Sequence, residues 1–156
     1  MPTSQQIFEQ EFEAIKSDLA NKYRELGMKA SGQWESSLEV ESGNMFGRVI
    51  GEPYTEQLVN GRKPGKFPPI QAIEKWIVDK GIVANIEGEI SVSSLAFLIA
   101  RKIAREGTEY FKEGGTDLVE SVFTPQRIQS IIDKLGEQMT MEFSSKIEKE
   151  LKQIAV

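Results

Sequence analysis

The side chains that could do chemistry in this chain are limited to carboxylates, amines and phenols. Among its 156 residues there is neither a His nor a Cys. His is the commonest general base and metal ligand, and it is the usual partner of a Ser nucleophile. Without Cys, disulfides and thiolate metal sites are excluded. This composition argues against an enzyme, and we expect no catalytic residues, no metal and no cofactor.

The remaining candidate motifs do not have the residue spacing that a phosphate-binding loop or a catalytic carboxylate pair requires. Residues 61–66 lack the GxxxxGK[ST] form of a phosphate-binding loop, and they precede Pro68-Pro69, which cannot offer phosphate a nest of N–H groups. Glu148 and Glu150 belong to one solvated helix and are not a spaced catalytic pair. We find no constellation of residues that carries bond-making chemistry.

A cationic loop at residues 61–68, the basic loop, is the most distinctive local feature. It reads GRKPGKFP, so its glycines admit positive φ while its prolines fix φ and remove hydrogen-bond donors. Its first six residues carry a net charge of +3, whereas residues 31–60 hold five acids and one base. A solvated surface with a cationic loop is the simpler explanation of this pattern, and contact of the loop with nucleic acid or an acidic neighbour is the alternative.

The candidate contact residues are the cations of this loop and of the helix near residue 100, with two aromatic residues in a glycine-rich excursion at 107–117. They are Arg62, Lys63, Lys66, Arg101, Lys102, Arg105, Tyr110 and Phe111. The aromatic pair is either tucked onto the domain or held for a partner, and the sequence leaves both alternatives open.

Length and composition predict one globular domain over residues 1–156. Apolar residues make up 39% and charged residues 28% of the chain, which is not the composition of a disordered tail. No apolar run approaches the ~20 residues that span a bilayer, so we expect no membrane partner. The start carries no signal-peptide pattern, and the lack of Cys is compatible with a reducing cytoplasm.

The N-terminal part predicts a helix followed by a hairpin. Residues 4–26, the body of a helical segment at 1–27, place apolar side chains at steps of three and four. Ser4 is the expected N-cap and Gly27 the expected stop. Residues 34–51 switch to alternation around a turn signal, which predicts a two-stranded antiparallel hairpin.

Shorter elements are expected in the middle of the chain, from apolar spacing and from Gly, Pro and Ser punctuation. They are a short helix at 53–60, a helix at 69–80, a connection at 82–90, a helix from Ser93 or Ser94 to about Glu106, and a strand at 118–123. Trp76 and Leu98 are expected to be core positions of the two longer helices. Trp34 is expected to be a core or sheet-edge anchor.

The longest expected element is a C-terminal helix at 125–155, with an apolar stripe along it and Thr124-Pro125 in the favoured order for a start. Gly136 is expected to break or bend it. At roughly 45 Å such a helix overhangs a domain of about 15 Å radius of gyration, so its end after Met139 should fray in a monomer and be buried on another copy or protein. The whole pattern predicts an α+β fold, a small antiparallel β-sheet packed with several α-helices.

Two motifs occur in order between residues 53 and 108. The first is PYTEQLVN at 53–60, followed by GRKPGKFPP at 61–69 and an Ile-x-x-Trp helix. The second is LAFLIARKIAREGT at 95–108. In this order they resemble the neck and tail-completion (head–tail connector) proteins of tailed double-stranded DNA phages, in which a GR-x-PGK-x-PP loop and an A-F-x-IARKIA-x-x-GT helix follow one another. After Thr108 the chain departs from the family, which often continues with a Pro-rich aromatic segment.

The resemblance implies a structural protein of the virion neck or tail, made in the host cytoplasm and without catalysis. Its partners would be copies of itself in a ring, the portal, adaptor or tail proteins of the virion, and packaged DNA by non-specific contact. The basic loop would then lie at a subunit or lumen boundary. Two alternatives stay open: a small nucleic-acid-binding accessory domain that uses Arg62, Lys63, Lys66 and Lys102, and an enzyme that works without His. The net charge of −5 counts against the nucleic-acid alternative.

Overall fold

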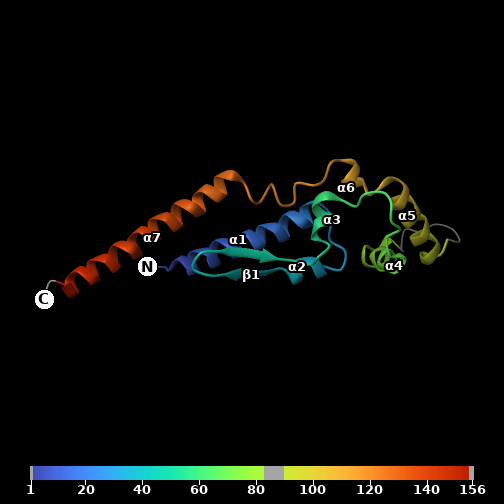
Figure 1. Ribbon diagram of the computed structural model, residues 1–156. Coiled ribbons are helices and arrows are strands. Elements are labelled where there is room, and N and C mark those ends of the chain that lie inside the picture. The colour runs from blue at the N-terminus through green and yellow to red at the C-terminus, as the bar shows by residue number, and fades with distance from the viewer. Residues whose placement is uncertain (1, 83–89, 155–156) are drawn as a thin grey trace. The chain divides into compact units, whose positions relative to one another are not determined.

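The computed structural model describes residues 2–82 and 90–154, and its fold class is α+β, as the sequence predicts. Figure 1 shows the helices and the two-stranded sheet in chain order. The chain divides into two compact units that alternate along the sequence: unit 1 is 1–18, 39–50 and 120–156, and unit 2 is 19–38 and 51–119. The expectation of a single domain concerns cooperative folding, and it stays a prediction.

Helix α1 (Ser4–Glu25) begins in unit 1 close to its predicted start. Its N-cap is Thr3 and not the predicted Ser4. The Oγ1 atom of Thr3 accepts a hydrogen bond from the N–H of Gln6 at 3.2 Å, and the N–H of Thr3 donates to Gln6 Oε1 at 2.8 Å. This reciprocal pair satisfies two donors at the start of the helix. Ser4 is buried, inside the first turn.

The predicted hairpin is present and packs on α1 within unit 1. Strands β1 (Glu39–Ser42) and β2 (Gly47–Ile50) are antiparallel, with Glu39 opposite Ile50. A Cβ atom on Gly47 would lie 2.7 Å from the ring of Phe12 on α1. Because only Gly leaves that space free, the strand can lie directly on the helix.

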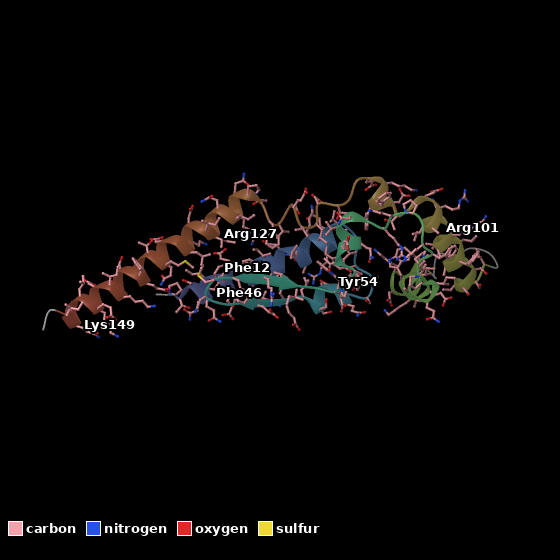
Figure 2. The ribbon with its side chains drawn as sticks, in the orientation of Figure 1. Phe12, Phe46, Tyr54, Arg101, Arg127 and Lys149 are labelled. Carbon is pink, nitrogen blue, oxygen red and sulfur yellow. The ribbon has the colours of Figure 1, made fainter. Side chains whose placement is uncertain are left out.

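Helix α7 (Pro125–Ile154) is the longest described element and continues unbroken through Gly136 (Figure 1). Of the break or bend predicted there, the break is wrong and the bend stays a prediction. Thr124 caps it as predicted, since its Oγ1 accepts a hydrogen bond from the N–H of Arg127 at 3.2 Å. Two ion pairs join the first half of α7 to α1 in unit 1. They are Arg127 with Asp18 at 2.7 Å and Lys134 with Glu11 at 2.5 Å. Figure 2 labels Arg127 at the start of the helix and Lys149 near its end.

Unit 2 has an aromatic core around Trp34, which lies in helix α2 (Gln33–Ser37) and not in the hairpin. The Trp34 ring is buried, with its centroid 4.7 Å from that of Tyr23 at the end of α1. Its Nε1–H donates a hydrogen bond to Thr55 Oγ1 at 2.8 Å. Thr55 begins helix α3 (Thr55–Asn60), so Trp34 connects three elements of unit 2.

Helices α4 (Ile70–Asp79) and α5 (Val92–Glu106) pack on one another in unit 2. Their shared core consists of Ile73 and Ile77 from α4 with Ala96 and Ala100 from α5. The two alanines present little side chain, so the helix backbones can approach closely. Helix α5 begins earlier than predicted, because Ser91 Oγ accepts the cap hydrogen bond from the N–H of Ser94 at 3.1 Å.

Two core predictions in these helices are wrong. Trp76 and Leu98 are 41% and 48% exposed. Trp76 lies about 100° around α4 from Ile77, at the edge of the apolar face. Leu98 lies on the side of α5 opposite to Ala96 and Ala100. Ala96 and Ala100 form the buried centre of the α5 side, with Leu95, Ile99 and Ile103 packed around them, and Leu98 is left outside.

The segment after α5 also differs from its prediction. Residues 107–117 contain the short helix α6 (Glu109–Lys112), and 118–123 form turns in place of the predicted strand. Leu118 and Val122 are buried while the residues between them are not, and this spacing of four is not the alternation of a strand. The connection predicted at 82–90 falls largely on residues outside the described ranges.

Candidate interaction surface

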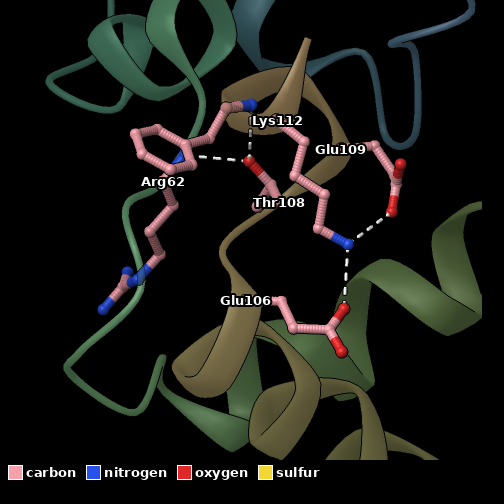
Figure 3. A network of polar contacts seen from close by, with 6 residues as sticks. Arg62, Glu106, Thr108, Glu109 and Lys112 are labelled. Atoms are coloured by element: carbon pink, nitrogen blue, oxygen red, sulfur yellow. Dashed lines mark hydrogen bonds and ion pairs between the residues drawn. The ribbon is translucent and has the colours of Figure 1, made fainter. Parts of the chain in front are cut away.

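Backbone hydrogen bonds fix the basic loop to the corner between α5 and α6. The N–H of Arg62 donates to Thr108 Oγ1 at 2.9 Å (Figure 3), and the N–H of Thr108 donates to the Arg62 carbonyl at 3.0 Å. The N–H of Gly65 donates to the carbonyl of Ala104, near the end of α5, at 2.8 Å. The tip of the loop is therefore held beside the last turns of α5.

Gly61 and Gly107 make this close approach possible. Both have positive φ, +75° and +80°. A Cβ atom on Gly61 would lie 2.2 Å from the backbone nitrogen of Phe111, and one on Gly107 would lie 2.8 Å from the carbonyl oxygen of Arg62. Neither position has room for a side chain or a backbone conformation that suits one. The close packing and the positive φ of the corner therefore explain why Gly occupies both positions.

The acids nearest to this corner are already engaged. Lys112 Nζ lies 2.9 Å from Glu106 Oε2 and 3.1 Å from Glu109 Oε1 (Figure 3). The hydrogen bond from Lys112 lowers the pKa of Glu106, and the hydrogen bonds to Glu106 and Glu109 raise the pKa of Lys112. The charges of these three side chains sum to −1, and the charges of Lys102 and Arg105 also lower the pKa of Glu106, but neither Glu forms an ion pair with a cation of the loop.

The six predicted contact cations form no ion pair within 4.0 Å with any residue that the structure describes. Lys63 and Lys66 project from the exposed tip of the loop. Arg101, labelled in Figure 2, and Arg105 are exposed and share one side of α5, since they are four residues apart. Lys102 lies about 100° further around the helix from Arg101 and is separate from this group.

An exposed aromatic pair lies among these cations. The rings of Phe67 and Phe97 have centroids 5.8 Å apart, and the two side chains are 48% and 47% exposed. Sequence reasoning did not select them, although Phe97 stands four residues before Arg101, on the same side of α5. We call the six residues from the loop tip and α5 the loop–α5 surface. They are Lys63, Lys66, Phe67, Phe97, Arg101 and Arg105.

Three of the predicted contact residues are partly buried and help to hold the fold together. Arg62 is half-buried and holds the corner through its backbone. Tyr110 and Phe111 lie half-buried in α6, and burial, followed by the charge of Glu113, raises the pKa of Tyr110. Of the two alternatives for this aromatic pair, the structure shows them tucked onto the domain.

The loop–α5 surface offers cations, which suit phosphate or carboxylate groups, and aromatic faces, on which flat groups such as bases can stack. Within the described ranges, no three His, Cys, Asp or Glu side chains are grouped so that they could hold a metal ion. None of the helices over the same ranges combines the length and the apolar character that crossing a membrane requires. Comparisons with protein-family models, curated proteins and solved structures gave no match to this chain.

Proposed function

We propose that this chain is a structural protein of a tailed phage virion, forming a ring in the neck or head–tail connector around the DNA passage. The observation that supports the proposal is the corner at Thr108. The two motifs that resemble connector proteins, 61–69 and 95–108, are joined there by reciprocal hydrogen bonds between Arg62 and Thr108. A pair of motifs that builds one surface is a stronger basis for the resemblance than two separate matches.

The proposed surface works by contact and not by chemistry. Its cations would attract the phosphates of packaged DNA or the carboxylates of an adjoining subunit, portal, adaptor or tail protein. The fixed backbone of the loop would hold those cations at one place on each copy, so little order is lost on assembly. No catalytic step, cofactor or metal enters the proposal, and the protein would reside in the virion.

A second candidate function is a small nucleic-acid-binding accessory domain. The pair of Phe67 and Phe97 beside Arg101 favours it, since single strands stack their bases on exposed aromatic rings next to cations. Such a domain would bind free DNA with an affinity that falls steeply as salt rises.

Deletion of the gene from the phage that encodes it, with complementation from a plasmid, tests the proposed function. We expect the deletion to give DNA-filled heads and separate tails in electron micrographs, and the wild-type plasmid to restore joined particles. Normal tailed particles from the deletion would overturn the proposal. Steep salt-dependent binding of the purified protein to DNA, together with normal particles, would establish the accessory domain instead.

A triple variant tests whether the basic loop takes part. Replacing Arg62, Lys63 and Lys66 with Ser should change the free energy of unfolding by no more than about 0.5 kcal/mol, because Lys63 and Lys66 are exposed and Arg62 holds the corner through its backbone, which Ser keeps. It should nevertheless impair head–tail joining or DNA retention. The control replaces Lys16, Arg48 and Lys75 with Ser, which removes three cations elsewhere, each from an exposed ion pair that is worth little, and it should complement fully. Normal virion yield and genome packaging from the loop variant would exclude the loop from the function.

A further inference from the structure

Helix α7 has two apolar faces, and its own unit covers only one of them. Ile131, Leu135 and Gln138 are buried in unit 1. About a third of a turn further around the helix axis lies a second face, the outer stripe, whose members are all exposed. They are Ile128, Ile132, Phe143, Ile147, Leu151 and Ile154. Phe143 is 64% and Ile154 is 80% exposed, so large apolar side chains face solvent along most of the helix.

Gly136 lies in the middle of the outer stripe, and its own chain gives no reason for a glycine there. A Cβ atom at this position would meet nothing within 4 Å, and its φ is not positive. Gly within a helix costs stability relative to Ala. A gap in an exposed apolar stripe therefore points to a side chain from another helix that enters it.

The stripe is complementary to itself when two copies run antiparallel. Placing the Phe143 of one copy over the Gly136 of the other puts Ile132 opposite Ile147. The same register puts Ile128 opposite Leu151, so five of the six members meet another apolar residue or the gap. A knob and a hole on one face are what a two-fold contact requires, since each copy uses the same surface.

The charges also fit a second copy. After Met139, helix α7 carries Glu142, Glu148 and Glu150 with Lys146, Lys149 and Lys152, which balance to zero in a chain of net charge −5. In this register residues 140–152 of one copy face residues 127–139 of the other, where Arg127 and Lys134 with Asp133 and Glu137 also balance to zero. The facing segments therefore do not repel one another, whereas a strongly charged partner would be matched by an excess of one sign.

We propose that a second copy of this chain docks on the outer stripe, with the two α7 helices antiparallel and Phe143 of each copy over Gly136 of the other. The contact goes beyond the proposed function and does not rest on it, because a two-fold pair is not the head-to-tail contact that closes a ring. The pairing itself is a property of the purified protein.

Sedimentation equilibrium on the full chain is the first test. Wild-type protein should form a dimer, and Phe143→Glu should be monomeric up to the millimolar range with unchanged helix content. Met141→Glu is the matched control, because Met141 is also exposed but lies on the opposite side of α7. A wild-type monomer at every concentration, or a dimer that persists in Phe143→Glu, would overturn the proposal.

Gly136→Ala separates pairing from folding. Because the site is open in the single chain, the added methyl should raise the unfolding midpoint of the monomeric Phe143→Glu background. In the wild-type background the same methyl fills the gap for Phe143 and should weaken pairing by about tenfold or more. Unchanged pairing in Gly136→Ala would show that the gap is not used.

Cysteine cross-linking tests the register, since the chain has no Cys of its own. A mixture of Ile132→Cys and Ile147→Cys proteins should form the mixed disulfide. Ile132→Cys alone should not cross-link, because its two copies would be about 22 Å apart in this register. In the control mixture, Lys152→Cys takes the place of Ile147→Cys. It should not cross-link to Ile132→Cys, because Lys152 lies on the opposite face of α7. Efficient cross-linking of Ile132→Cys to itself would show a parallel pair and overturn the register.

The two proposals fail separately. If the purified protein is monomeric but deletion of its gene still gives separate heads and tails, the proposed function stands and the α7 contact is wrong. If the protein dimerises with the expected cross-linking pattern but deletion of its gene leaves particles normal, the α7 contact stands and the proposed function is wrong.

Discussion

The side-chain hydroxyl of Thr108 accepts a hydrogen bond from the backbone N–H of Arg62 at 2.9 Å, although 46 residues separate the two in the chain. The same hydroxyl accepts a longer bond from the N–H of Phe111 at 3.4 Å, where Thr108 is the N-cap of α6. One oxygen thus orders both the entry to the basic loop and the start of the helix after α5.

Removing that hydroxyl should loosen the corner. Thr108→Val keeps the shape of the side chain but leaves the N–H of Arg62 without its acceptor, which costs about 1–3 kcal/mol when the donor cannot reach water. Urea unfolding should show the loss, and Thr108→Ser should restore most of it. Equal stability of the Val and Ser variants would show that solvent replaces the hydroxyl.

Gly61 combines a close approach to Phe111 with a backbone conformation, φ +75° and ψ −175°, that essentially only Gly adopts. Gly61 and Gly81 have nearly equal φ, +75° and +74°, but a Cβ on Gly81 meets nothing within 4 Å. Gly81→Ala should therefore cost about 1 kcal/mol for its angle alone. Gly61→Ala should cost at least about 3 kcal/mol, since the methyl also collides with the backbone of Phe111. Similar denaturation midpoints for the two variants would mean that the corner yields easily.

Glu35 should make the stability of unit 2 depend on pH. Burial alone would raise the pKa of this carboxyl, but the hydrogen bonds and charges of Arg24, at 2.5 Å, and Lys29, at 3.2 Å, outweigh it and lower the pKa. A carboxyl whose pKa is lower in the folded state stabilises the fold at pH values above its ordinary pKa. That stabilisation is lost as the pH falls through the folded-state pKa.

Glu35→Gln should therefore flatten the loss of stability between about pH 5 and pH 3, as followed by urea midpoints at each pH. Glu13→Gln is the control, because it removes a carboxylate from the exposed pair with Lys16, which is worth little. A wild-type protein and a Glu35→Gln variant with parallel pH profiles would contradict the role of this ion pair.

Neighbouring residues of α4 should respond very differently to truncation. Ile77→Ala should cost about 2–5 kcal/mol, because Ile77 is wholly buried between α4 and α5 and leaves a cavity. Trp76→Ala should cost about 1 kcal/mol or less, because much of its ring already faces solvent. Thermal melts of the two variants measure the difference. A larger loss at Trp76 would mean that another surface covers this ring.

The long helices were predictable from the sequence because their apolar spacing and their caps agree. The limits of α1, α4 and α7 fall within a residue or two of the predicted ones, and Gly27 has the positive φ expected of a helix stop. Side-chain burial was less predictable. Their positions on apolar helix faces suggested Trp76 and Leu98 as core residues, but the buried centre of the α5 side consists of Ala96 and Ala100, with larger residues packed around them.

The candidate surface was predictable in its charges and not in its construction. The sequence marks Lys63, Lys66, Arg101 and Arg105 by type, but it does not show that Gly65 binds the carbonyl of Ala104 and so brings them together. Phe67 and Phe97 escaped selection for the same reason, since their pairing is a tertiary contact between residues 30 positions apart. Local patterns carry no direct record of such contacts.

The way in which unit 1 is assembled from the chain sets an order for its synthesis. Its first two segments end at residue 50, and its third begins at residue 120. At ribosomal rates of about 5–20 residues per second, the roughly 70 residues between them delay the third segment by about 4–14 s. During that interval the nascent α1 exposes Ile7 without α7, while the second segment of unit 2, residues 51–119, is made. We therefore expect chaperones that recognise apolar helices to bind the nascent chain in this window, before its last helix leaves the ribosome.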